Sequence, residues 1–123
     1  MTRSLEPPQI ICLCGSTRFS KLFRSAERHL AHLGYITLSV GSFAQSDKRD
    51  PLVHQRLCEL HHQKIELADT VFVLNKDGYI GIHTAQQITF ALSINKPIHY
   101  LEIPLSPTFP QASETQIPEQ ETA

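Results

Sequence analysis

QIICLCG, residues 9–15, is the stretch that decides the fold, because it is a short apolar run that stops at a glycine. Its length, its isoleucines and its ending favour a buried strand. The segment Phe19 to Leu33 then repeats apolar residues at steps of three and four, as an amphipathic helix does. Ser16 or Thr17 is expected to cap this helix. The repeated residues are Phe19, Leu22, Phe23, Ala26, Leu30 and Leu33.

The rest of the chain continues this alternation of strand and helix. Further strands are expected at Tyr35–Val40, Thr70–Leu74 and Ile98–Ile103, and further helices at Pro51–Ala68 and from Thr84, as the N-cap, to Asn95. The expected inward residues of these helices are Leu52, Leu57, Leu60, Ile65 and Leu67, then Ile88, Ala91 and Leu92. Such alternation predicts an α/β fold with a parallel sheet of four or five strands and helices on both faces.

The chain of 123 residues has the size of one domain, and we place that domain at residues 9–104. Residues 1–8 are expected to form an N-terminal arm. Residues 105–123 are rich in Pro, Gln, Glu, Ser and Thr and predict a disordered tail.

Composition excludes several classes of function. The net charge of -1 argues against binding a nucleic acid polymer, because that needs a basic face. No apolar run approaches a membrane span or a secretory signal, so we expect a cytoplasmic protein without a membrane partner. Cys12, Cys14 and Cys58 favour reduced thiols, since a C-x-C without a second cysteine pair is a weak zinc signal.

Two loops follow strands at the edge of the sheet where such folds bind ligands. The first, Cys14-Gly15-Ser16-Thr17-Arg18, offers a close backbone approach, two hydroxyls and a guanidinium suited to phosphate. An ordinary turn with a capping serine explains the same residues equally well.

The second loop runs from Asp77 through Gly78, Tyr79 and Gly81 to the helix that carries His83 and Gln87. Tyr79 at its tip is able to stack on a base or a sugar. For Gln87, a polar surface position is the simpler interpretation.

The segment LHHQKIELAD, residues 60–69, supplies a third candidate group. His61 is either a general base or ligand partner, or a partly buried structural histidine. The pair His61 and His62 is no metal site, because adjacent side chains on a helix diverge by about 100°. Asp69 is expected to be a structural turn residue.

Taken together, these motifs resemble those of a known protein family. CGSTRF at 14–19, LHHQKIELAD at 60–69 and DGYIG at 77–81, followed by T-x-x-Q-I-x-F-A at 84–91, resemble the nucleoside 2-deoxyribosyltransferase-like superfamily, in particular its small bacterial and phage branch. The resemblance spans about residues 10–101. It implies a flavodoxin-like three-layer α/β/α fold and cleavage of N-glycosidic bonds in nucleosides or nucleoside 5′-monophosphates, by transfer or hydrolysis.

The resemblance also implies roles for single residues. The usual nucleophile is a glutamate that forms a glycosyl ester, and Gln87 occupies its position here. His61 and Asp77 become candidate acid–base or orienting groups. The expected substrate-binding residues are Cys14, Gly15, Ser16, Thr17, Arg18, Tyr79, Gly81 and His83. No metal and no cofactor are implied, and a homodimer or higher homo-oligomer is expected.

Gln87 leaves three interpretations open. An amide is a far poorer nucleophile than a carboxylate, so the usual double displacement should fail. The chain is then a family enzyme with altered chemistry, a nucleotide-binding or sensing module without catalysis, or a Glu-to-Gln variant made to trap substrate.

Overall fold

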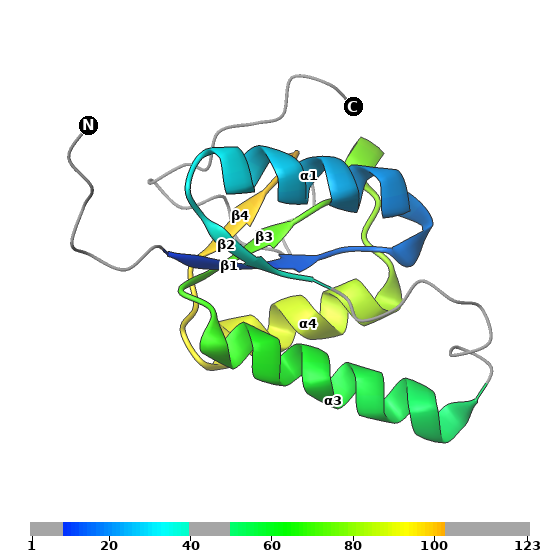
Figure 1. Ribbon diagram of the computed structural model, residues 1–123. Helices are drawn as coiled ribbons and strands as arrows, with labels where there is room; N and C mark the ends of the chain where they lie inside the picture. Colours follow the sequence, from blue (N-terminus) through cyan, green and yellow to red (C-terminus); the bar gives the residue numbers. More distant parts are fainter. Residues whose placement is uncertain (1–8, 40–49, 103–123) are drawn as a thin grey trace.

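The computed structural model describes residues 9–39 and 50–102, in which strands and helices alternate as expected (Figure 1). The expected arm, the expected tail and the predicted strand ends at Val40 and Ile103 lie outside the described residues. The elements are β1 Ile10–Cys14, η1 Thr17–Phe19, α1 Ser20–His32, β2 Ile36–Leu38, α3 Pro51–Leu67, β3 Thr70–Val73, η2 Lys76–Gly78, α4 Ile82–Ser93 and β4 Ile98–Tyr100.

The four strands form one parallel sheet in the order β2-β1-β3-β4. In its register, Ile10 pairs with Ile36, Leu13 with Phe72, and Val73 with Tyr100. Helix α1 covers one face of the sheet, and α3 and α4 cover the other (Figure 1). The prediction of a three-layer, flavodoxin-like α/β fold is therefore confirmed.

Side chains alternate between the two faces of the sheet and build two cores. One lies under α1 and is built mainly from apolar side chains, among which Phe23 is fully buried. The other lies against α3 and α4 and includes Cys12 and Cys14, which share a face as their spacing predicted. Asp69 is a structural turn residue as expected, since its carboxylate accepts a hydrogen bond of 2.7 Å from the Ile10 backbone N–H.

The first predicted helix agrees with α1 to within one residue at each end, but the inward positions predicted for its two end residues need correction. Phe19 closes the separate 3₁₀ turn η1 and is only partly buried, and Leu33 follows α1 and is 47% exposed. The buried face of α1 consists of Leu22, Phe23, Ala26 and Leu30.

The predicted inward faces of the other two helices also need correction. On α3, Leu52, Leu60 and Leu67 are exposed, and the buried residues are His61 and Ile65. Helix α3 lies beside α4 under the sheet, so only a narrow stripe of it is covered.

Helix α4 starts earlier than predicted. Gly81 is its N-cap, and Thr84 lies inside the helix with its side chain buried. Ile88 and Ala91 face inward as expected, whereas Leu92 is 44% exposed.

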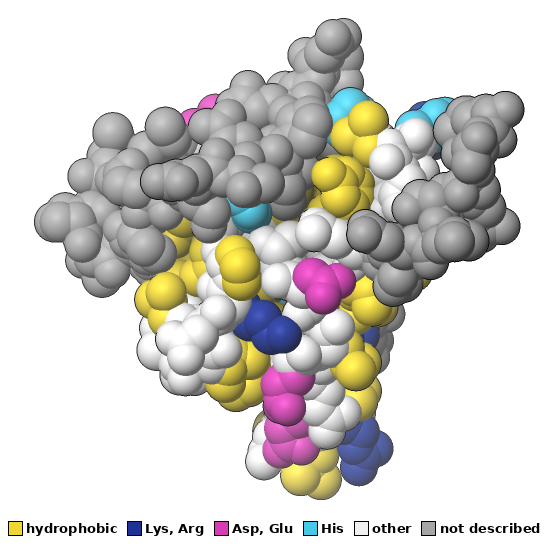
Figure 2. Space-filling model, turned by 90° about the vertical axis from the view of Figure 1, so that its left-hand side faces the viewer, with side chains coloured by type: hydrophobic (Ala, Val, Ile, Leu, Met, Phe, Trp, Pro, Cys, Tyr) yellow, Lys and Arg dark blue, Asp and Glu magenta, His cyan; other side chains and the backbone are white. Residues whose placement is uncertain are grey.

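Two further observations concern the surface. Within residues 9–39 and 50–102, the helices fall short of the length and apolar character that crossing a membrane requires. Figure 2 views the end of the molecule where the strands begin, and there charged side chains of both signs lie among hydrophobic and neutral ones.

Candidate functional site

The strand order places a switch point at the centre of the sheet. From β1 the chain crosses to β2 on one side and then to β3 on the other side of β1. The loops after β1 and β3 therefore leave the same edge in opposite directions, and ligands of doubly wound folds bind between such loops. This edge is the right-hand end of the molecule in Figure 1.

The first loop needs a glycine at position 15 because the fold leaves little room for a side chain there. A Cβ atom there would lie 3.2 Å from the Leu74 carbonyl oxygen and 3.3 Å from Phe23 Cε2. Ser16 then caps the 3₁₀ turn, where its Oγ accepts a hydrogen bond of 3.3 Å from the Arg18 backbone N–H. Ser16 is thus a cap as predicted, although of η1 and not of the longer helix.

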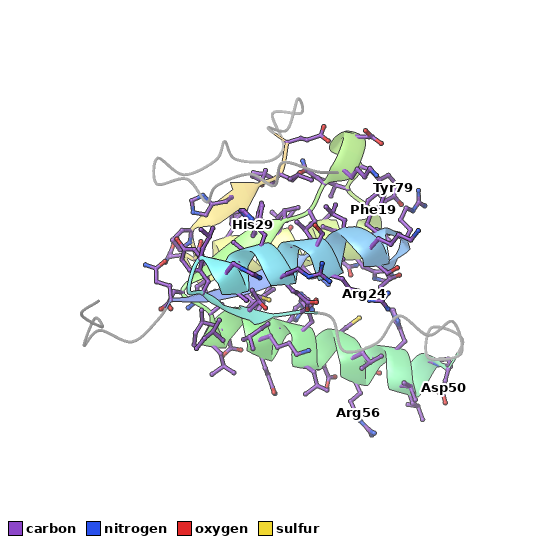
Figure 3. The ribbon with its side chains drawn as sticks, turned by 45° about the horizontal axis from the view of Figure 1, so that its top comes forward. Phe19, Arg24, His29, Asp50, Arg56 and Tyr79 are labelled. Atoms are coloured by element: carbon purple, nitrogen blue, oxygen red, sulfur yellow. The ribbon has the colours of Figure 1, made fainter. Side chains whose placement is uncertain are left out.

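The two loops contact each other through their side chains. The Arg18 guanidinium lies 4.2 Å from the centre of the Tyr79 ring. Phe19 meets the same ring edge-on, with centroids 6.0 Å apart, and both aromatic side chains lie together at this end in Figure 3. An aromatic ring held between a cation and a second ring has a defined position although Tyr79 remains 39% exposed.

The second loop is shaped by tight backbone turns. Asp77 and Gly78 both have positive φ, 56° and 76°, and the Asp77 backbone N–H donates to the Glu102 carboxylate at 2.6 Å. The Asp77 side chain itself is exposed. A Cβ atom on Gly81 would lie 3.1 Å from the Tyr79 hydroxyl, so Gly81 leaves room for the ring.

Asn75 ties this loop to the end of β4 from a fully buried position. Its amide donates to the Glu102 carbonyl at 2.7 Å and accepts from the Glu102 N–H at 2.9 Å. No role was predicted for Asn75 from the sequence. An asparagine directly after an apolar strand was the signal available for this role.

His83 and Gln87 lie on the flank of α4 that faces α3. The His83 ring packs against His54 with centroids 4.8 Å apart, and two turns later Phe90 stacks on His62 at 4.3 Å. Gln87 lies between these two contacts on the same flank, one helical turn from each. It is partly buried, and its Oε1 is buried without a hydrogen-bond partner among the described residues.

His61 lies in the core and not at the rim. It is 4% exposed, and its Nε2 lies 3.3 Å from Cys14 Sγ and 3.8 Å from Cys12 Sγ. The hydrogen bond with Cys14 is the largest cause that lowers the pKa of Cys12, and His61 and Lys64 lower it further, to about 6 in spite of burial. The pKa of Cys14 is raised well above its usual value by the same hydrogen bond and by burial.

The structure thus divides the predicted site residues into groups. Arg18, Tyr79 and Gly81 lie together where the two loops meet. Cys14 and His61 contact each other beneath them, His83 and Gln87 share the α3-facing flank of α4, and Asp77 is exposed on its turn. Phe19 was missed as a site residue, because the helical spacing assigned it to the core.

Comparisons with known proteins bear on this fold. No family model matches the chain, and no curated protein matches it. Among solved structures, it is similar to a 2-deoxyribosyltransferase from the psychrotolerant bacterium Bacillus psychrosaccharolyticus. The two are 19% identical, the match covers 74% of this chain and 70% of the other, and the TM-score is 0.60. This likeness shows a shared flavodoxin-like fold.

Proposed function

We propose that the chain binds a nucleoside or nucleoside 5′-monophosphate at the edge where the two loops meet. It acts on the N-glycosidic bond of this ligand as a hydrolase or a 2-deoxyribosyltransferase-like protein. Gln87 limits the rate of this reaction. The main support for this proposal is the Gln87 amide oxygen, which is buried and has no hydrogen-bond partner in the described part of the chain. A buried polar atom without a partner costs about 1–3 kcal/mol. A ligand that donates a hydrogen bond to this oxygen would remove that cost.

The neighbouring residues suit the parts of such a ligand. Arg18 offers a guanidinium at the loop edge for a phosphate or sugar oxygen, with the Ser16 and Thr17 hydroxyls beside it. The exposed part of the Tyr79 ring offers a stacking surface for a base or sugar. The fold of the 2-deoxyribosyltransferase neighbour supports this class of ligand by analogy.

The amide at position 87 determines the expected chemistry. A glutamate there would attack the anomeric carbon and form an ester, whereas the neutral amide is a far poorer nucleophile. Direct attack by water then needs a base, and the candidates are His61 and Asp77. His61 is enclosed with the two thiols and Asp77 is exposed, so we expect slow base release.

A second function is favoured by the same residue. A site that keeps a hydrogen-bonding amide and lacks the carboxylate is suited to holding a nucleotide without cleaving it. In this alternative the chain is a nucleotide-binding or sensing module. The two functions share the ligand and differ in turnover.

The test compares the natural chain with Gln87→Glu, and uses Gln86→Glu as a matched control because Gln86 is exposed on the same helix. Each protein is incubated with a panel of nucleosides and 5′-monophosphates, and released base is measured by chromatography. Slow release that Gln87→Glu increases and Gln86→Glu leaves unchanged supports the enzyme. Stabilisation by a nucleotide in a thermal shift, with no release by any variant, supports the binding module. Absence of both binding and release would refute the proposed ligand class.

A further inference from the structure

A histidine, a cysteine and a second histidine come together between α3 and α4. His54 and Cys58 are one helical turn apart on α3, and His83 is the second residue of α4. One ligand atom from each of the three lies within 4.8 Å of the other two. No step of the proposed function uses His54 or Cys58.

The distances suit a tetrahedral cation. Cys58 Sγ lies 3.6 Å from His54 Nε2. With metal–sulfur bonds of about 2.3 Å and metal–nitrogen bonds of about 2.0 Å, tetrahedral ligands are separated by about 3.3–3.6 Å. The pair on α3 already has this separation. The His83 nitrogen needs to approach by at most about 1.5 Å, which a side-chain rotation on an exposed residue allows.

The local packing favours a metal over a purely structural cluster. His54 and Cys58 are only partly buried and His83 is exposed, so these side chains are not needed to fill a core. The His54 and His83 rings come from different helices and lie 4.8 Å apart at an interplanar angle of 64°. Exposure also provides a path for the cation and a free position for water.

A second trio contains the same ligand types and differs in its surroundings. Cys12, Cys14 and His61 also approach one another within 4.8 Å, but their exposed fractions are 0%, 0% and 4%. Their sulfur and nitrogen atoms lie in the core. An incoming hydrated ion would have to open that core, so the partly exposed trio is the better site.

We propose that His54, Cys58 and His83 form a binding site for a divalent cation of the Zn²⁺ class, with three protein ligands and an open fourth position for water. Two imidazoles and one thiolate suit borderline-soft cations such as Zn²⁺ better than they suit Mg²⁺ or Ca²⁺. The cation would join α3 to the start of α4 at the same edge as the two loops. This site shares His83 with the expected substrate-binding residues, whereas His54 and Cys58 have no part in the proposed activity toward nucleosides.

The experiment is a Co²⁺ and Zn²⁺ titration of the full, tag-free, chelator-treated chain without nucleotide. Co²⁺ reports tetrahedral geometry by its intense d–d bands and thiolate ligation by a charge-transfer band. We expect one ion per chain, with Zn²⁺ displacing Co²⁺. Cys58→Ser should abolish the charge-transfer band, and Cys58→Ser and His83→Ala should each weaken Zn²⁺ binding at least about tenfold, the smallest loss seen even for outer-shell partners.

The controls are His32→Ala on the exposed end of α1 and Cys12→Ala in the buried trio. Both should bind Co²⁺ like the natural chain, and circular dichroism establishes that each variant is folded. The proposal is overturned if the natural chain binds no Co²⁺ or if Cys58→Ser keeps the charge-transfer band. It is equally overturned if Cys12→Ala, while folded, loses the band, since the metal would then lie in the core.

Discussion

The two faces of the sheet are built differently. Under α1 the buried side chains are mostly apolar, from Leu22 and Phe23 on the helix to Phe72 on the sheet, and His99 lies on the same face because it pairs with Phe72. Under α3 and α4 the aliphatic residues share the interior with two thiols, His61 and Thr84, and the Gln87 amide oxygen is buried beside them. The first face is the more apolar of the two, and the second holds more groups that ionise, bind or react. This difference separates variants that should unfold the protein from variants that should change its chemistry.

The largest effect is expected from Phe23→Ala on the apolar face. Phe23 is fully buried, so truncation leaves a cavity and should lower the free energy of unfolding by about 3–5 kcal/mol. Urea denaturation measures the change. The matched control is Leu52→Ala on α3, where the side chain is 75% exposed and the change should stay within about 0.5 kcal/mol. Equal losses in both variants would contradict the difference between the faces.

A pH-dependent effect is expected on the other face. The pKa of Cys12 is about 6 in the folded chain against an ordinary value of 9.0, with the Cys14 hydrogen bond as the largest cause. Because the folded pKa is depressed, the stability from Cys12 is complete above pH 9 and disappears as the pH falls through about 6.

Urea denaturation of the natural chain and of Cys12→Ala at several pH values measures this contribution. The free energy of unfolding of the natural chain, relative to that of the variant, should rise between pH 6 and pH 9. If the difference in the free energy of unfolding between the two proteins stays constant over this range, Cys12 is an ordinary buried thiol.

The smallest effect, of opposite sign, is expected at Gln87. Replacing it by Met keeps the length of the side chain and removes the buried oxygen that lacks a partner within the described ranges. We expect Gln87→Met to raise the free energy of unfolding by about 1 kcal/mol and to abolish nucleotide stabilisation in a thermal shift. Exposed Gln86→Met serves as the control and should change neither quantity. A destabilised Gln87→Met would mean that the amide holds the fold together.

Sequence periodicity was a good guide where one helix packs on one face of the sheet. Leu22, Phe23, Ala26 and Leu30 of α1 are buried as their spacing predicted. On α3 it identified Ile65 correctly but misplaced Leu52, Leu60 and Leu67, because this helix shares its face of the sheet with α4. Leucine spacing alone does not reveal which side of a helix a neighbour will cover.

The candidate site was likewise predictable from the sequence only in part. The two glycine loops were located from the sequence, because loops that follow buried parallel strands lie at the edge where ligands of such sheets bind. The pairing of Arg18 and Phe19 with Tyr79 joins residues about 60 positions apart, and no local pattern encodes it. The assignment of substrate-binding residues within these loops stays a prediction.

By itself, the sequence determined the alternation of strands and helices, the parallel sheet and the shared face of Cys12 and Cys14, since these follow from local periodicity and chain connectivity. Only the tertiary structure decided that His61 meets both thiols, that Gln87 buries an oxygen without a partner in the described chain, and that His83 approaches His54 and Cys58. The physical reason is that these contacts depend on how α3 and α4 lie side by side beneath the sheet. Their relative placement is set by packing over the whole domain and not by any one segment.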